Sequence, residues 1–196
     1  FNWEENFVNE YFKLTNKIPL SYVEVGYWKQ KNKSKNKFYN IKEEDLVKFK
    51  KKSIHNLAII NDFHYCSKNI YDYPKKKDKL LSLIRLTTRL EDLDECIEFI
   101  NELKYYTKLK VSLNIFNFSN YSISKIESKL KDISMSKIDY LYIADTHGSL
   151  DFFNLKVDFK RFILKLNKIN QKVGFHFHDN IGTAFSNFIF SKNINF

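Results

Sequence analysis

The feature that most constrains the fold is a regular alternation of strand-like and helix-like segments. Runs rich in β-branched and aromatic residues predict six strands, over residues 22–27, 56–60, 81–86, 109–116, 140–144 and 173–178. Segments between most of them place apolar residues at three- and four-residue steps, as over residues 90–103 and 159–169. Strands that alternate with helices at intervals of roughly thirty residues are typical of βαβ units, so the sequence predicts an α/β protein with a parallel sheet.

Capping patterns predict where two of the helices begin. Thr88 with Glu91, and Ser124 with Glu127, have the spacing of a capping box, in which two side chains satisfy the first backbone donors of a helix. A further helix over residues 7–14 is expected to lead into the first strand. The lysine-rich stretch 29–37 has no apolar periodicity and is interpreted as a mobile loop between a strand and a helix.

Glycine usage separates the possible parallel-sheet folds. The chain has four glycines and neither the GxGxxG nor the GxxxxGK[ST] motif, which argues against a phosphate-cradling doubly wound fold. The six strands instead match part of a (β/α)8 TIM barrel, whose functional groups lie at the C-terminal ends of the strands. A complete barrel needs about 250 residues. We therefore expect residues 1–196 to form a single incomplete TIM barrel with about six βα units.

A His-x-His pair in the last predicted strand is the strongest candidate for a functional site. His176 and His178 are two residues apart, so in a strand they share one face, with Phe175 and Phe177 on the other. Their Cα atoms would be roughly 6.6–7 Å apart, which lets both rings converge on one divalent ion. The alternative is a pair of polar groups that fill the mouth of a barrel.

Three motifs, in order, resemble the DRE-TIM metallolyases. These are residues 22–27 with Glu24, residues 138–148 with an Asp-Thr-x-Gly end at Asp145 and Thr146, and residues 173–184 with the His-x-His pair. This superfamily includes 4-hydroxy-2-oxovalerate aldolase, hydroxymethylglutaryl-CoA lyase and isopropylmalate synthase. The resemblance extends over nearly the entire chain and supports the same (β/α)8 barrel.

The resemblance implies a metal-dependent carbon–carbon lyase of the aldolase type. His176 and His178 would be ligands of a divalent metal, Mn or Mg, with Zn as a further candidate. The metal would chelate a 4-hydroxy-2-keto acid or related α-keto acid and stabilise the enolate left by cleavage. The implied substrate-binding or supporting residues are Glu24, Asp145, Thr146 and Asn180.

The sequence departs from the family pattern at one motif. It contains no Arg-Asp-Gly, which in the family supplies the third metal ligand and the enolate-stabilising arginine. The arginine and the general base are expected upstream of Phe1, and a further ligand beyond Phe196, so no catalytic residue is assigned and this fragment is predicted to be inactive or nearly so. The alternatives are an acyl-CoA-dependent condensing enzyme similar to isopropylmalate synthase, and a degenerate barrel that acts as a binding module.

Several side chains keep two possible roles. Asp145 could contact substrate or cap the following helix. Glu24 needs a partner inside a barrel, either the missing arginine or water in the barrel mouth. Arg85 could form a buried salt bridge or contact substrate. Asn180 and Asn187 are interpreted as hydrogen-bonding braces.

The charge and the cysteines of the chain indicate which partners and which cellular compartment to expect. The net charge is +10, but of 33 basic residues only Arg85, Arg89 and Arg161 are arginines, and direct base readout relies on arginine. The lysines are therefore interpreted as a solvated surface, with no nucleic-acid partner. No apolar run is long enough to cross a membrane, and Cys66 and Cys96 lack metal-binding spacing. We expect a cytoplasmic protein with a keto-acid substrate, no membrane partner, and a possible homo-oligomeric state.

Overall fold

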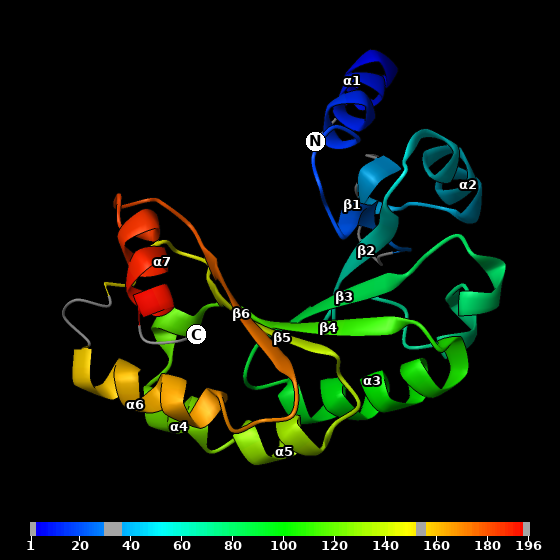
Figure 1. Ribbon diagram of the computed structural model, residues 1–196. Coiled ribbons are helices and arrows are strands. Elements are labelled where there is room, and N and C mark those ends of the chain that lie inside the picture. The colour runs from blue at the N-terminus through cyan, green and yellow to red at the C-terminus, as the bar shows by residue number, and fades with distance from the viewer. Residues whose placement is uncertain (1–2, 30–36, 152–155, 194–196) are drawn as a thin grey trace. The chain divides into compact units, whose positions relative to one another are not determined.

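Six parallel strands alternate with helices in the computed structural model, which describes residues 3–29, 37–151 and 156–193 (Figure 1). The strands are β1 (Tyr22–Tyr27), β2 (Asn56–Asp62), β3 (Leu83–Thr88), β4 (Lys110–Ile115), β5 (Tyr140–Asp145) and β6 (Lys172–Phe177). They are hydrogen-bonded in sequence order, β1-β2-β3-β4-β5-β6. All six predicted strands are confirmed, with ends that differ from the prediction by at most two residues.

Helices occupy the segments between and around the strands. They are α1 (Glu5–Thr15), α2 (Glu43–Lys52), α3 (Leu93–Thr107), α4 (Ile123–Glu127), α5 (Leu130–Met135), α6 (Lys156–Leu166) and α7 (Ala184–Asn193). Short 3-10 turns are η1 (Lys37–Tyr39), η2 (Ile70–Asp72), η3 (Lys76–Asp78) and η4 (Phe118–Asn120). Most of the predicted loop 29–37 lies outside the described residues. Within the described residues, no helix is both long and apolar enough to span a membrane.

The chain divides into two compact units that share α3 and β4. The first unit comprises Phe1–Thr87 and Glu98–Ser112, and the second comprises Thr88–Ile97 and Leu113–Phe196. In the first unit, β2 is buried along residues 57–61, as expected of a parallel strand covered on both faces. Phe12 of α1 packs on Phe49 of α2 with ring centroids 5.6 Å apart, so these two helices share an apolar contact.

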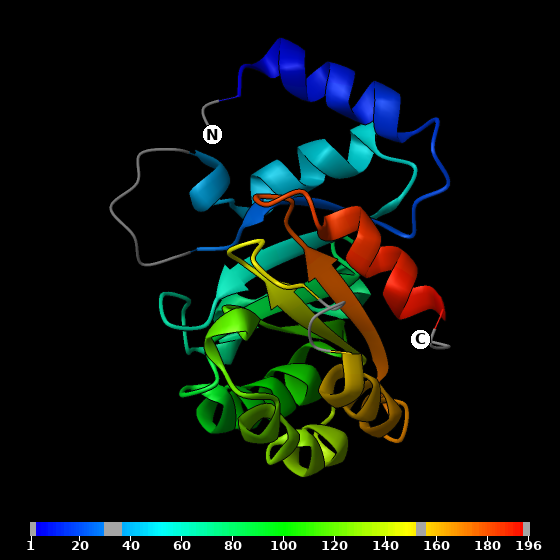
Figure 2. The ribbon, with the colours of Figure 1, turned by 90° about the vertical axis from the view of Figure 1, so that its left-hand side faces the viewer.

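The second unit is built around the pair β5 and β6. The two strands are in register from Tyr140 opposite Lys172 to Asp145 opposite Phe177. Helices α4, α5 and α6 lie along one side of this pair in both views of the ribbon (Figures 1 and 2). Residues 162, 163 and 166 of α6 are fully buried, as the predicted apolar stripe requires. The polar residues Asp145 and His178 lie at the C-terminal end of β5 and one residue beyond the end of β6.

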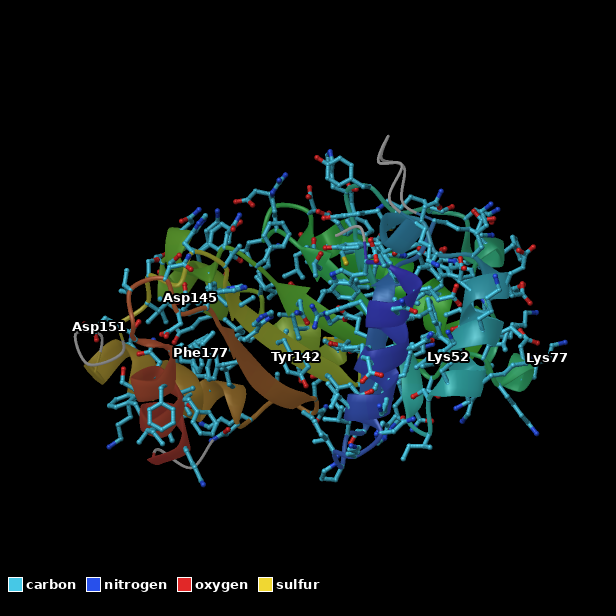
Figure 3. The ribbon with its side chains drawn as sticks, turned by 90° about the horizontal axis from the view of Figure 1, so that it is seen from above. Lys52, Lys77, Tyr142, Asp145, Asp151 and Phe177 are labelled. Atoms are coloured by element: carbon cyan, nitrogen blue, oxygen red, sulfur yellow. The ribbon has the colours of Figure 1, made fainter. Side chains whose placement is uncertain are left out.

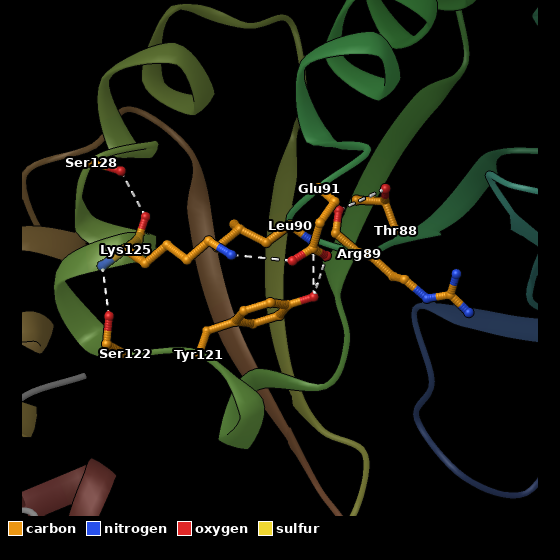
Figure 4. A network of polar contacts seen from close by, with 8 residues as sticks. All are labelled: Thr88, Arg89, Leu90, Glu91, Tyr121, Ser122, Lys125 and Ser128. Atoms are coloured by element: carbon orange, nitrogen blue, oxygen red, sulfur yellow. Dashed lines mark hydrogen bonds and ion pairs between the residues drawn. The ribbon is translucent and has the colours of Figure 1, made fainter.

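The two predicted capping boxes are wrong in detail, because neither helix begins where the pattern places it. Helix α3 begins at Leu93, and the Glu91 carboxylate instead accepts a hydrogen bond from the Tyr121 hydroxyl at 2.7 Å (Figure 4). Lys125 also pairs with Glu91 at 3.2 Å. The cap of α4 is Ser122, whose hydroxyl accepts from the Lys125 amide, so Ser124 lies inside the helix.

Candidate metal centre

The two histidines of the His-x-His pair converge on one side of β6. The ring centroids of His176 and His178 are 4.6 Å apart with planes inclined by 33°. Phe175 and Phe177 stack on each other at 5.4 Å, in keeping with the alternation of side chains along a strand. Strand β6 ends at Phe177, so His178 lies one residue beyond it. The expected shared face of the two imidazoles is therefore present in the structure.

A backbone carbonyl of the neighbouring strand orients His178. Its Nδ1 lies 2.7 Å from the carbonyl oxygen of Asp145, the last residue of β5. Because a carbonyl only accepts hydrogen bonds, Nδ1 is the donor in this contact, which leaves Nε2 as the nitrogen available to a metal. Metal-binding histidines typically donate their other N–H to such a carbonyl. The local bonding of His178 thus suits a metal ligand through Nε2.

The Asp145 side chain organises the turn that follows β5. Its carboxylate is 1% exposed and accepts hydrogen bonds from the amides of Ser149 at 3.2 Å and Leu150 at 3.0 Å. Figure 3 shows Asp145 and Phe177 near each other, with Tyr142 further back along β5. Asp145 therefore caps a turn, whereas the next helix of the described chain, α6, begins only at Lys156.

Gly148 allows this turn to pack against the segment after β6. Its φ is +57°, and a Cβ there would lie 2.7 Å from the Asn180 amide nitrogen and 2.8 Å from the His178 carbonyl oxygen. Both neighbours are backbone atoms and cannot rotate away. Only glycine satisfies the conformation and the space together, which explains the glycine of the Asp-Thr-x-Gly motif.

The remaining predicted residues of the second unit form cross-links between loops. The Thr146 hydroxyl accepts a hydrogen bond from the Asn117 amide at 2.8 Å. Asn180 donates from Nδ2 to the His147 carbonyl at 2.8 Å, and the buried Asn187 donates likewise to the Leu150 carbonyl at 2.8 Å. Both asparagines thus brace the turn after β5 against the segment after β6. The Asn117 amide and the Asp145 carbonyl were missed by sequence reasoning because backbone groups leave no residue signature.

The donor set fits part of a metal site. The His176 and His178 rings supply two nitrogen donors, which suit Mn or Zn and are compatible with a divalent cation that also binds oxygen ligands. No cluster of three or more His, Cys, Asp or Glu side chains that could hold a metal occurs among the residues the structure describes. Among the described residues, the two histidines are therefore the candidate ligands of this site.

Glu24 has a partner within the first unit. Arg85 Nε of β3 lies 3.1 Å from Glu24 Oε2 of β1. Burial raises the pKa of Glu24, and the Arg85 guanidinium lowers it by a smaller amount. Tyr27, at the end of β1, stacks on Tyr39 with centroids 5.0 Å apart, and burial raises its pKa as well. Of the two roles left open for Arg85, the structure contains the salt bridge.

The shifted carboxyl group makes a pH-dependent contribution to stability. Because the pKa of Glu24 is raised in the folded state, its contribution is present below the unfolded pKa and is lost as the pH rises through the folded pKa. Glutamine does not ionise, so we expect the free energy of unfolding of Glu24→Gln, relative to the parent, to increase between about pH 4 and about pH 8. Urea unfolding at both pH values measures this, with the exposed Glu10→Gln as the control. A relative stability that falls with pH would contradict the assignment.

The chain is similar to known proteins in its structure. No family model matches the chain, and no curated protein matches it in sequence. In structure it is similar to the N-terminal domain of a candidate aldolase from Bacteroides vulgatus, with 20% identity, 99% of this chain and 64% of that chain covered, and a TM-score of 0.71. It is also similar to the HMG-CoA lyase of Bacillus subtilis, with 11% identity, 98% and 68% coverage, and a TM-score of 0.70.

The chain is also similar in structure to part of a longer enzyme chain. The carboxyl transferase domain of Rhizobium etli pyruvate carboxylase matches with 14% identity, 78% of this chain and 28% of that chain covered, and a TM-score of 0.60. The chain thus spans about two thirds of the length of the first two structures, at 64% and 68%. These likenesses confirm the expected fold class: the chain has part of the TIM-barrel fold of these aldolase, lyase and carboxyl transferase domains.

Proposed function

We propose that this chain is the metal-binding part of a carbon–carbon lyase of the aldolase type, acting on a 4-hydroxy-2-keto acid or related α-keto acid. The observation that carries the proposal is the His176–His178 pair, with His178 Nδ1 held 2.7 Å from the Asp145 carbonyl. The likeness to lyase and aldolase domains supports the reaction class. The Rhizobium etli domain has also been solved with pyruvate, an α-keto acid.

Each residue of the centre has a role in this proposal. A divalent cation, when bound, would act as a Lewis acid on the carbonyl and carboxylate of the keto acid. His176 and His178 would hold the cation, and the Asp145 carbonyl would keep the proton on Nδ1 of His178. Gly148 and Asn180 keep the segment that carries His178 against the turn after β5. These contacts would hold Nε2 of His178 in one orientation, which favours binding of the metal before the substrate arrives.

The test is calorimetric binding of pyruvate with and without Mn²⁺. We expect pyruvate to bind only when Mn²⁺ is present and His178 is intact, because the keto acid would attach through the metal. L-lactate, which lacks the keto group, is the matched ligand control and should bind more weakly. Equal binding of pyruvate without metal, or to His178→Ala, would overturn the proposal. Release of pyruvate from 4-hydroxy-2-keto acids then assays cleavage, with little activity expected because the sequence has no Arg-Asp-Gly motif.

A further inference from the structure

A hollow of about 450 Å³ lies at the N-terminal ends of the strands in the first unit. The first residues of three strands, Tyr22 of β1, Asn56 of β2 and Lys110 of β4, line it, together with Ser82 just before β3. Functional groups of parallel barrels lie at the opposite, C-terminal ends of strands. The hollow is therefore separate from the candidate metal centre, and nothing proposed above accounts for it.

Five lysines line this hollow, which we call the lysine hollow. They come from α2, from η3 and the residue after it, from the residue after α3, and from the start of β4, namely Lys50, Lys76, Lys79, Lys108 and Lys110. The other lining residues are Tyr22, Asn56, Leu81 and Ser82, so no carboxylate is among the described residues that line it. A concave surface lined by one sign of charge concentrates counter-ions of the other sign.

Three lysines of the hollow contact neutral groups of the chain. Lys50 Nζ donates to the His55 carbonyl at 3.3 Å. Lys108 Nζ lies 4.3 Å from the centre of the Tyr105 ring, and Lys110 Nζ lies 6.0 Å from that of Tyr22. These partners are a neutral carbonyl and neutral rings. The nearby Asp78 carboxylate accepts from the Lys75 amide at 2.8 Å, as a local cap.

Two of the lysines occupy unfavourable backbone conformations. Lys79 has φ +57° and Lys108 has φ +59°. Each follows the end of a helical segment, where glycine or asparagine is the usual residue because the left-handed conformation crowds a Cβ. Strained residues that persist in a fold tend to mark functional positions. Lys79 and Lys108 both line the same hollow, although glycine would adopt this backbone conformation with less strain.

We infer that the lysine hollow binds a small molecule that carries several linked phosphate groups. Lysine ammonium groups bind phosphate as point charges, and five of them around one hollow match more than one phosphate. The volume lies within the range of small-molecule sites, about 300–1,000 Å³. Tyr22, Asn56 and Ser82 add hydrogen-bonding groups beside the lysines, and Ser82 Oγ donates to Asn56 Oδ1 at 3.1 Å. A hollow of about 450 Å³ matches a compact polyanion in size.

The test is titration of the full chain with inorganic tripolyphosphate, followed by calorimetry. The hollow variant is the triple substitution Lys76→Gln, Lys79→Gln and Lys108→Gln. Its matched control removes three exposed lysines of the second unit, Lys131→Gln, Lys160→Gln and Lys168→Gln, with the same change in net charge. We expect the affinity to fall at least about tenfold in the hollow variant and less than about threefold in the control. Equal losses in both would mean general charge attraction and would overturn the inference.

A single substitution separates binding from folding. Lys108→Gly relieves the left-handed backbone at φ +59° and is expected to keep or raise the midpoint of urea unfolding. It should still weaken tripolyphosphate binding by about threefold, because one ammonium group is lost. Unchanged affinity in this stable variant would contradict a role for Lys108.

ATP and tripolyphosphate titrated in parallel distinguish a nucleotide from a free polyphosphate. A single-stranded oligonucleotide that binds more tightly than both would overturn the small-molecule assignment.

Discussion

Replacing His178 by alanine is expected to weaken Mn²⁺ binding by at least about tenfold. The substitution removes one of two imidazoles whose ring centroids lie 4.6 Å apart, and it also removes the nitrogen that the Asp145 carbonyl orients. His176→Ala should have a similar effect, since neither ring alone can chelate. Isothermal titration calorimetry with Mn²⁺ and with Zn²⁺ measures both variants against the parent chain.

His64→Ala is the matched control for these variants. His64 is an exposed histidine after β2 in the first unit, and its ring packs edge-on against Tyr65 at 4.8 Å. Its removal should leave Mn²⁺ affinity unchanged within about twofold. Equal Mn²⁺ affinities for the parent, His176→Ala and His178→Ala would show that the two histidines only fill space at the end of the strand and do not bind the metal.

Asp145→Ala is expected to lower the free energy of unfolding by about 3 kcal/mol. Asp145 is 1% exposed, and its carboxylate accepts hydrogen bonds from the amides of Ser149 and Leu150, so its removal leaves both donors without their acceptor, and Leu150 is buried. The same turn carries Gly148 against His178, so Mn²⁺ affinity should fall as well. Urea unfolding followed by circular dichroism gives the stability, and calorimetry gives the affinity.

Two further variants show whether the buried acceptor is the cause. Asp145→Asn keeps one side-chain oxygen acceptor and should lose less stability than Asp145→Ala. Asp132→Ala removes an exposed carboxylate of α5 and should change the free energy of unfolding by less than about 0.5 kcal/mol. A loss below about 1 kcal/mol for Asp145→Ala would contradict the proposed role of its carboxylate in the turn.

The strands and the histidine pair could be predicted from the sequence because both follow from backbone periodicity. A parallel strand that is buried on both faces, such as β2, is a continuous apolar run in the sequence. Residues two apart in a strand share a face whatever surrounds them, so the convergence of His176 and His178 needed no tertiary information. The role of the Asp145 carbonyl needed the register of β5 against β6, which no single strand encodes.

Features that depend on distant partners were not predictable. Glu91 has the spacing of a cap residue, but its carboxylate contacts the Tyr121 hydroxyl and the Lys125 ammonium group, which lie about thirty residues further along the chain. The lysines of the hollow come from separate segments, and Lys108 and Lys110 do not belong to any lysine-rich run. A sequence pattern therefore identified the basic stretches as solvated surface and missed the place where they meet.

Pulsed electron paramagnetic resonance of the Mn²⁺-loaded chain, produced with ¹⁵N-labelled histidine, tests directly whether His176 and His178 bind the metal. We expect coupling of the bound ion to imidazole nitrogens, lost in the double variant His176→Ala, His178→Ala and retained in His64→Ala. The same spectrum recorded with pyruvate should change, because the keto acid would enter the coordination sphere. Bound Mn²⁺ without histidine nitrogen coupling, or coupling that persists in the double variant, would contradict the assignment of these two residues as metal ligands.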